Sequence, residues 1–277
     1  MGENREEGFI CMNNIKVEDR DHGIRVILID RPKALNALNT ETLLELQKVL
    51  KETAVSSEIR VVVLTGGGEK AFIAGADITE MMGKNLSQGI SFAKVGQEVT
   101  RLLESLPQPT IAMVGGFALG GGAEMAIACD FIYASDSAVF GQPEVGLGVI
   151  PGFGGTARLS RFVGLPMAKD LIFSGRKIKS DEALRIGLVN EVVKRSELND
   201  FVMKRAQQIA SHSAGAVRAC KRVMNEFEET HGIDYKLDME AQEFGSLFGT
   251  KDQKEGMSAF MEKRKPNFEG VSLKESK

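Results

Sequence analysis

The chain has 277 residues, with 35 Lys and Arg against 38 Asp and Glu, and 43% of it is hydrophobic. This composition is typical of a globular protein with a large core, and the balanced charge argues against nucleic acid as a partner. No apolar run reaches the roughly 18–20 residues of a membrane-spanning helix, so we expect no membrane partner. The start is polar and acidic, unlike a secretory signal. Scattered cysteines fit a cytoplasmic, reducing location; they are Cys11, Cys129 and Cys220.

The first two thirds of the chain alternates short apolar runs with helical patterns. Runs that are β-branched or continuously apolar predict strands, which lie at 24–30, 60–65, 110–114, 131–135 and 138–140. Helices are predicted after Asn39, a good N-cap residue, and over about 87–104, where apolar residues recur at helical spacing. Strands that alternate with helices favour an α/β fold with at least one mostly parallel sheet.

The composition changes after about residue 195, where glycine becomes sparse and Lys, Glu, Met and Phe recur at helical spacing. This pattern predicts amphipathic helices over roughly 197–265. We therefore expect a core of residues 1–196, whose first ~14 residues form a flexible extension, and a C-terminal helical region of residues 197–277.

Several common catalytic motifs are missing from the sequence. It contains no G-x-G-x-x-G, no G-x-x-x-x-G-K-[ST] and no G-x-S-x-G, which argues against the usual dinucleotide, P-loop and nucleophile-elbow sites. The histidines form no H-E-x-x-H pair and are scattered at His22, His212 and His231. Each is expected to be a surface or structural residue.

The sequence pattern that most suggests a catalytic site is a glycine-rich turn next to a carboxylate residue. The turn 120–122 leads into a predicted helix with Glu124 in its first turn, where unpaired N–H groups can stabilise negative charge on an oxygen. Glu144 follows a short strand twenty residues later, and the small-residue loop 74–77 can supply another N–H. Singly, each feature is more often structural, since an early acid complements the helix dipole. Spacing alone does not show that the two carboxylates meet.

Five segments together resemble the enoyl-CoA hydratase/isomerase (crotonase) family, over about residues 15–268. In chain order they read RPKALNAL (31–38), AGAD (74–77), GGFALGGGAE (115–124), FGQPE (140–144) and GLGVIPGFGGTARL (146–159). The resemblance implies a spiral of repeated ββα turns with a C-terminal helical region that builds homotrimers, often paired into homohexamers. It also implies an acyl-CoA thioester substrate whose thioester oxygen is held by the backbone N–H groups of Ala76 and Gly121.

In family members that hydrate 2-enoyl-CoA, two glutamates flank the double bond, and the matching residues here are Glu124 and Glu144. The resemblance suggests that Glu124 deprotonates the water that attacks C3, while Glu144 exchanges the proton at C2. The expected reaction is reversible hydration of a trans-2-enoyl-CoA to a 3-hydroxyacyl-CoA, without a metal or redox cofactor. An enoyl-CoA isomerase is the main alternative. Isomerases commonly keep only the later glutamate, so the presence of Glu124 favours hydration.

The resemblance also places the coenzyme A along a set of mostly small residues: Lys33, Ala34, Ala37, Ala74, Asp77, Ile78 and Thr79. Two residues depart from the family pattern. Thr79 stands where many hydratases carry a basic residue, and Ala157 stands where glutamine is common. Residues 79–106 are expected to form part of the acyl-pocket wall, with apolar side chains at Met81, Met82, Leu86 and Phe92.

A non-catalytic RNA-binding relative of the family is an alternative from another class. Such a protein needs a basic face, but the segment 41–60 carries Lys48, Lys51 and Arg60 against four glutamates. No basic stripe forms there, so RNA binding by this segment would be weak and strongly salt-dependent. We therefore expect no nucleic-acid partner.

Overall fold

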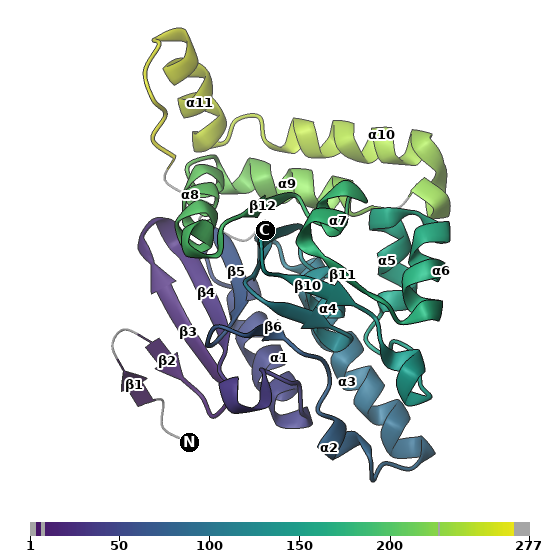
Figure 1. Cartoon of the computed structure of the whole chain (residues 1–277). Coiled ribbons are helices and arrows are strands. Elements are labelled where there is room, and N and C mark those ends of the chain that lie inside the picture. The colour runs from purple at the N-terminus through teal and green to yellow at the C-terminus, as the bar shows by residue number, and fades with distance from the viewer. Residues whose placement is uncertain (1–3, 7–8, 227, 269–277) are drawn as a thin grey trace.

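The computed structural model describes residues 4–6, 9–226 and 228–268 (Figure 1). Its strands are β1 (Asn4–Glu6), β2 (Phe9–Cys11), β3 (Ile15–Arg20), β4 (Ile24–Ile29), β5 (Val61–Gly66), β6 (Ala71–Ile73), β7 (Thr110–Val114), β8 (Phe117–Leu119), β9 (Phe131–Ser135), β10 (Val139–Gly141), β11 (Lys177–Lys179) and β12 (Glu191–Val193). Its α-helices are α1 (Thr40–Ala54), α2 (Ile78–Met81), α3 (Leu86–Ser105), α4 (Gly121–Ala126), α5 (Gly155–Val163), α6 (Leu165–Ser174), α7 (Ser180–Arg185), α8 (Leu198–Ala210), α9 (Ala214–Met224), α10 (Glu228–Ser246) and α11 (Lys251–Met261).

Two sheets organise these elements. The eight-stranded sheet has the order β1-β2-β3-β4-β5-β7-β9-β12, and the four-stranded sheet has the order β11-β10-β8-β6. In the larger sheet, β4, β5, β7, β9 and β12 run parallel, while β1 to β4 pair as antiparallel neighbours. The architecture is therefore α/β with largely parallel sheets, as the sequence predicts.

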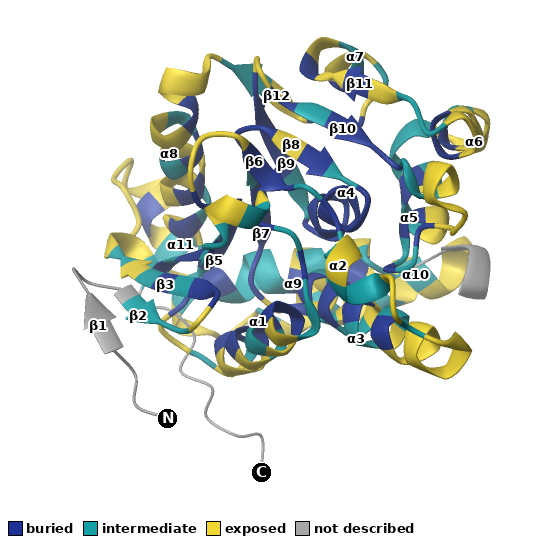
Figure 2. Cartoon of the chain, turned by 60° about the horizontal axis from the view of Figure 1, so that its bottom comes forward, coloured by how far each residue is buried: buried dark blue, intermediate teal, exposed yellow. Residues whose placement is uncertain are grey.

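Burial on both faces explains the continuously apolar strand segments. Helix α8 covers one face of the large sheet, where Val202 and Ala206 pack in a cluster with Ile24. The opposite face packs against α1, α3 and α4. Because β5 is covered from both sides, every residue from Val61 to Leu64 is apolar and fully buried (Figure 2).

The predicted elements of the core are confirmed. The five predicted strands are present as β4, β5, β7, β9 and β10, with ends shifted by at most one residue. Helix α1 begins where predicted because the Asn39 side chain accepts the N–H of Thr42 at 2.9 Å. Helix α3 begins one residue earlier than predicted, at Leu86, after a capping box formed by Asn85 and Gln88.

The beginning of the chain contains a strand that the sequence analysis does not predict. Phe9–Cys11 forms β2 and pairs in antiparallel fashion with β3, with Ile10 opposite Val17. Ile10 and Met12 also pack against the main core. The flexibility expected of the first ~14 residues stays a prediction, and residues 1–3 and 7–8 of that segment lie outside the described ranges.

The helices predicted over 197–265 are present as α8 to α11. The first of them, α8, lies directly on the large sheet, so the core continues past residue 196. Helices α10 and α11 lie outermost in Figure 1, at the top of the molecule. None of the helices in the described ranges is long and apolar enough to cross a membrane.

A buried asparagine fixes the loop that follows β4. Leu35 and Asn36 both adopt left-handed backbone, with φ of 51° and 59°. The Asn36 side chain donates to the carbonyls of Gly67 and Ala71, each at 2.9 Å, and accepts the N–H of Arg31 at 3.0 Å. These bonds join the loop to the end of β5 and the start of β6.

The same loop then holds the segment 74–77. The Leu38 N–H donates to the Gly75 carbonyl at 2.8 Å, and the Asp77 N–H donates to the Leu38 carbonyl at 2.9 Å. The peptide N–H of Ala76 lies between these two anchors. Asn36 therefore supports, through the loop, the position of a backbone donor in the candidate site.

Asn36→Ala is expected to lower the free energy of unfolding by about 2–4 kcal/mol, because it leaves buried backbone groups without partners. Asn13→Ala is the matched control, since Asn13 makes an exposed hydrogen bond to Glu41; we expect a change within about 0.5 kcal/mol. Urea denaturation of both variants measures the difference. Equal stabilities for the two variants would contradict the anchoring role of Asn36.

Candidate active site

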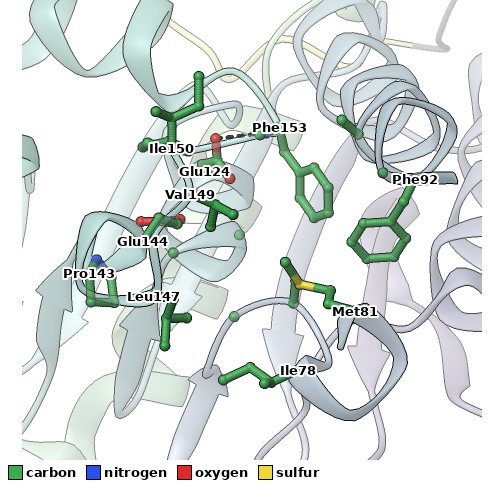
Figure 3. Close-up of a pocket in the computed structure, with 18 of the residues that line it drawn as sticks. Ile78, Met81, Phe92, Glu124, Pro143, Glu144, Leu147, Val149, Ile150 and Phe153 are labelled. Carbon is green, nitrogen blue, oxygen red and sulfur yellow. Dashed lines mark hydrogen bonds between the residues drawn. The ribbon is translucent and has the colours of Figure 1, made fainter. Parts of the chain in front are cut away.

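A cavity of about 570 Å³ lies between the α2–α3 side of the molecule and the segment 143–154. Its walls are mostly apolar, and its labelled lining in Figure 3 includes Ile78, Met81, Phe92, Pro143, Leu147, Val149, Ile150 and Phe153. Two carboxylates, Glu124 and Glu144, line the same cavity. A mostly apolar pocket with a few convergent polar groups is typical of a small-molecule site.

Glu124 lies in the short helix α4 and is 1% exposed. Its Oε1 accepts the backbone N–H of Phe153 at 2.8 Å and that of Gly155 at 2.7 Å. Burial raises the pKa of Glu124 above its usual range, while these two N–H groups act against that shift. The carboxylate is therefore oriented by fixed donors, and its second oxygen is left for a ligand.

Glu144 begins the 3₁₀ helix η3 (Glu144–Leu147) and lies near Glu124, across the cavity from Phe92 (Figure 3). Burial and the nearby charge of Glu124 raise the pKa of Glu144 to about 7. With its NH₂ group turned to the carboxylate, Gln142 donates to both oxygens at 3.0 and 3.1 Å. Gly120 has a positive φ of 50°, which favours glycine, and a Cβ there would lie 2.7 Å from Glu144 Oε1 and displace the carboxylate. A carboxyl group that titrates near neutral pH is suited to proton transfer.

Two backbone N–H groups face the cavity near these carboxylates. Ala76 and Gly121 both line it, and the Ala76 nitrogen is 3.5 Å from the position that a Cβ on Gly121 would occupy. Within the described ranges, neither N–H donates to a protein acceptor. The pair can therefore stabilise an oxygen that gains negative charge.

Comparison with known proteins identifies the family of the chain. A family model described as enoyl-CoA hydratase/isomerase matches residues 19–271. The chain belongs to the enoyl-CoA hydratase/isomerase family. The family assignment made from the five sequence segments is confirmed.

The relatives are similar along nearly their whole length. A short-chain-enoyl-CoA hydratase of Clostridium acetobutylicum is 52% identical over 92% of this chain and 97% of its own. A crotonyl-CoA hydratase of Syntrophomonas wolfei is 49% identical over 94% and 99%. The crystal structure of an enoyl-CoA hydratase from Bacillus anthracis superposes with a TM-score of 0.91 at 40% identity, covering 94% of this chain and all of that one. The fold of this chain is thus the one seen in these hydratases.

The structure brings together the residues that the family resemblance assigns to chemistry. Glu124, Glu144, Ala76 and Gly121 line one cavity, together with Ala74 and Ile78 from the expected coenzyme A set. Thr79 is exposed beside them, and its N–H donates at 3.2 Å to Oδ1 of Asp77, the N-cap residue of α2.

The other residues of the expected coenzyme A set do not belong to the lining of this cavity. Asp77 forms an ion pair with Arg31 at 3.0 Å, and the Arg31 guanidinium also donates to the Ala37 carbonyl. Lys33 and Ala34 belong to the 3₁₀ helix η2 (Pro32–Ala34), and Lys33 lines a separate hollow. A role in binding coenzyme A remains a prediction for these residues.

Two of the four apolar side chains predicted for the acyl-pocket wall line the cavity. These are Met81 and Phe92, whereas Met82 and Leu86 are 82% and 83% exposed and lie outside its lining. Sequence reasoning missed Phe153, although the segment 146–159 was already part of the family pattern. Ala157 is exposed at the start of α5 and does not contribute to the lining.

Removal of the negative charge at position 124 is expected to lower the pKa of Glu144. Burial, the larger cause of the shift, remains in Glu124→Gln, so the pKa should fall from about 7 yet stay above the usual 4.5. An NMR titration of the Glu144 carboxyl carbon measures it. The exposed Glu58 offers a control, because Glu58→Gln should leave the titration of Glu144 where it was. A pKa that does not move in Glu124→Gln would show that the two carboxyl groups are not coupled.

Proposed function

We propose that this protein is an enoyl-CoA hydratase that reversibly adds water across the 2,3 double bond of a trans-2-enoyl-CoA to give a 3-hydroxyacyl-CoA. The observation that carries the proposal is the convergence of Glu124, Glu144 and two unpaired N–H groups on one apolar cavity. The hydratase names of the relatives from Clostridium acetobutylicum and Syntrophomonas wolfei support the same reaction.

The first step of the proposed reaction is attack of water at C3. Glu124 takes a proton from the water, and the electrons of the double bond move onto the thioester oxygen as an enolate. The N–H groups of Ala76 and Gly121 stabilise that oxygen, and one such donor is worth about 2.7–4 kcal/mol at the transition state. Glu144 then gives a proton to C2, which completes the addition of water.

The environments of the two carboxyl groups support this division of roles. Burial raises the pKa of Glu124 above its usual range, which makes its ionised form a stronger base, while two backbone N–H groups favour that ionised form and hold it in place. Glu144 is raised to a pKa of about 7, so it carries its proton in a large fraction of molecules near neutral pH. Two carboxyl groups in different environments can thus act as base and as acid in the same reaction.

Coenzyme A enters this reaction as part of the substrate. We propose that it lies along the segment around Lys33 to Ala37 and the segment Ala74 to Thr79, with Asp77 held by Arg31. The two carboxylates and the N–H pair supply the proton transfer and the charge stabilisation, so no metal or redox cofactor takes part.

Since the cysteines are not joined in disulfides, we place the enzyme in the cytoplasm.

A homotrimer or homohexamer is the proposed assembly. Helices α10 and α11 expose many large apolar side chains, and contiguous exposed apolar surface marks protein interfaces. These side chains include Ile233, Leu237, Phe244, Phe248, Phe260 and Met261. The family resemblance supports three or six copies.

An enoyl-CoA isomerase is the second candidate. It moves one proton between two carbons and requires no base for water. The burial of Glu124 against two N–H donors is a specific arrangement that this reaction does not need, so the geometry favours hydration. Conversion of a 3-enoyl-CoA to a 2-enoyl-CoA at a rate above hydration would support the isomerase instead. The cavity is mostly apolar and carries two carboxylates, so it does not support an RNA-binding role.

Loss of the enoyl-thioester absorbance after addition of crotonyl-CoA tests the proposed reaction. Glu124→Gln and Glu144→Gln should each reduce kcat by about 10²- to 10⁴-fold, since each removes a proton-transfer group. Circular dichroism checks that both variants fold, and Glu58→Gln is the matched control at an exposed position, with unchanged activity expected. A folded Glu124→Gln enzyme with the wild-type rate would rule out the proposed role of Glu124.

The pH dependence should have the same form in the two directions of the reaction. Hydration needs Glu124 ionised and Glu144 protonated, and the two proton transfers leave Glu124 protonated and Glu144 ionised, which is the form that dehydration needs. Both forms carry one proton on the pair, so kcat/KM should fall in both directions as pH rises above about 7. Initial rates in both directions across this range measure the effect. A hydration rate that stays constant as pH rises well above 7 would contradict the assignment of Glu144 as the group that exchanges the C2 proton.

A further inference from the structure

The ring of Phe153 fills the gap between helices α3 and α4 at one end of the cavity (Figure 3). A Cβ placed on Gly96 of α3 would lie 2.1 Å from this ring, and a Cβ on Gly121 of α4 would lie 3.0 Å from it. The residue is 3% exposed. The ring is therefore wedged between two glycines that leave room for it and for little else.

A second aromatic ring extends this wall. Phe92 of α3 packs against Phe153 with ring centroids 5.4 Å apart and the planes tilted by 56°. The Lys84 Nζ lies 5.1 Å from the centroid of the Phe92 ring. Both phenylalanines line the cavity, so the wall consists of two packed rings.

The backbone of Phe153 is held independently of its ring. Its N–H donates to Glu124, and its carbonyl accepts the Thr100 hydroxyl at 2.7 Å and an Arg158 N–H at 3.3 Å. A smaller side chain at position 153 can therefore enlarge the cavity while the support of the Glu124 carboxylate stays in place.

The position of the wall fixes which part of the substrate it meets. The thioester oxygen is assigned to Ala76 and Gly121, and C3 is assigned to the neighbourhood of Glu124. Ile78, on the proposed coenzyme A side, lies at the opposite end of the view from Phe153. The carbons beyond C3 therefore run towards the two rings.

We propose that Phe153, wedged between Gly96 and Gly121 and packed on Phe92, closes the acyl end of the cavity and makes the enzyme selective for four-carbon 2-enoyl chains. This inference rests on the proposed hydratase function. A pocket that rejects one extra methylene discriminates by about 10- to 200-fold, so a single closing ring is enough for strong selectivity.

The test compares kcat/KM for crotonyl-CoA and trans-2-octenoyl-CoA in the wild type, Phe153→Ala and Phe153→Leu. The ratio of octenoyl to crotonyl activity should rise at least about tenfold in Phe153→Ala and by less in Phe153→Leu. The matched control is Phe162→Ala in α5, because Phe162 packs against the same core outside the cavity lining. Its ratio should equal that of the wild type.

A binding series separates failure of this inference from failure of the proposed reaction. Calorimetry with butyryl-CoA and octanoyl-CoA needs no turnover, and Phe153→Ala should bind octanoyl-CoA at least about tenfold more tightly relative to butyryl-CoA than the wild type does. An unchanged ratio in a folded Phe153→Ala or Phe153→Leu enzyme overturns the inference. If the wild type binds both thioesters but hydrates neither enoyl-CoA, the hydratase proposal fails and the binding ratio still decides the role of Phe153.

Discussion

Glu124 Oε1 accepts the N–H groups of Phe153 and Gly155 at 2.8 and 2.7 Å inside a nearly solvent-free part of the protein. Burying a carboxylate without hydrogen-bond partners costs a large amount of free energy, so these two bonds are what allow Glu124 to be buried. They also join α4, which carries the carboxylate, to the loop that leads into α5. Thr100 and Arg158 hold the same loop against α3. Glu124 Oε1 and the Phe153 carbonyl together thus join α4, α3 and the segment that leads into α5.

Small residues make this arrangement possible. At Gly120, a Cβ would reach within 2.7 Å of Glu144, and the residue has a positive φ of 50°. At Gly121, the missing side chain lets the Phe153 ring lie against α4, and the residue also lines the cavity. In the proposed function this glycine serves two purposes, since its N–H stabilises the thioester oxygen and its missing side chain makes room for the ring that we propose bounds the acyl chain.

Much of the fold could be predicted from the sequence because it follows from local patterns. The apolar run of β5 and the N-cap at Asn39 produced the expected strand and helix within a residue. The sequence was less informative where long-range packing decided the outcome. It does not predict the strand Phe9–Cys11, which forms by pairing with β3. Met82 and Leu86 face solvent, although Met81 and Phe92 of the same segment line the cavity. The short helix α2 and the capped start of α3 set the direction of each side chain.

The sequence by itself determined the α/β class, the family and the identity of the two candidate carboxylates, since these depend on periodicity and on motifs that lie within short segments. The tertiary structure alone decided that Glu124 and Glu144 share one cavity, because their meeting depends on how α4 and the segment after β10 pack. It also decided the raised pKa of Glu144 and the wedge made by Phe153. Burial and charge proximity act through space, and no local pattern records which distant backbone N–H or ring will fill the remaining volume.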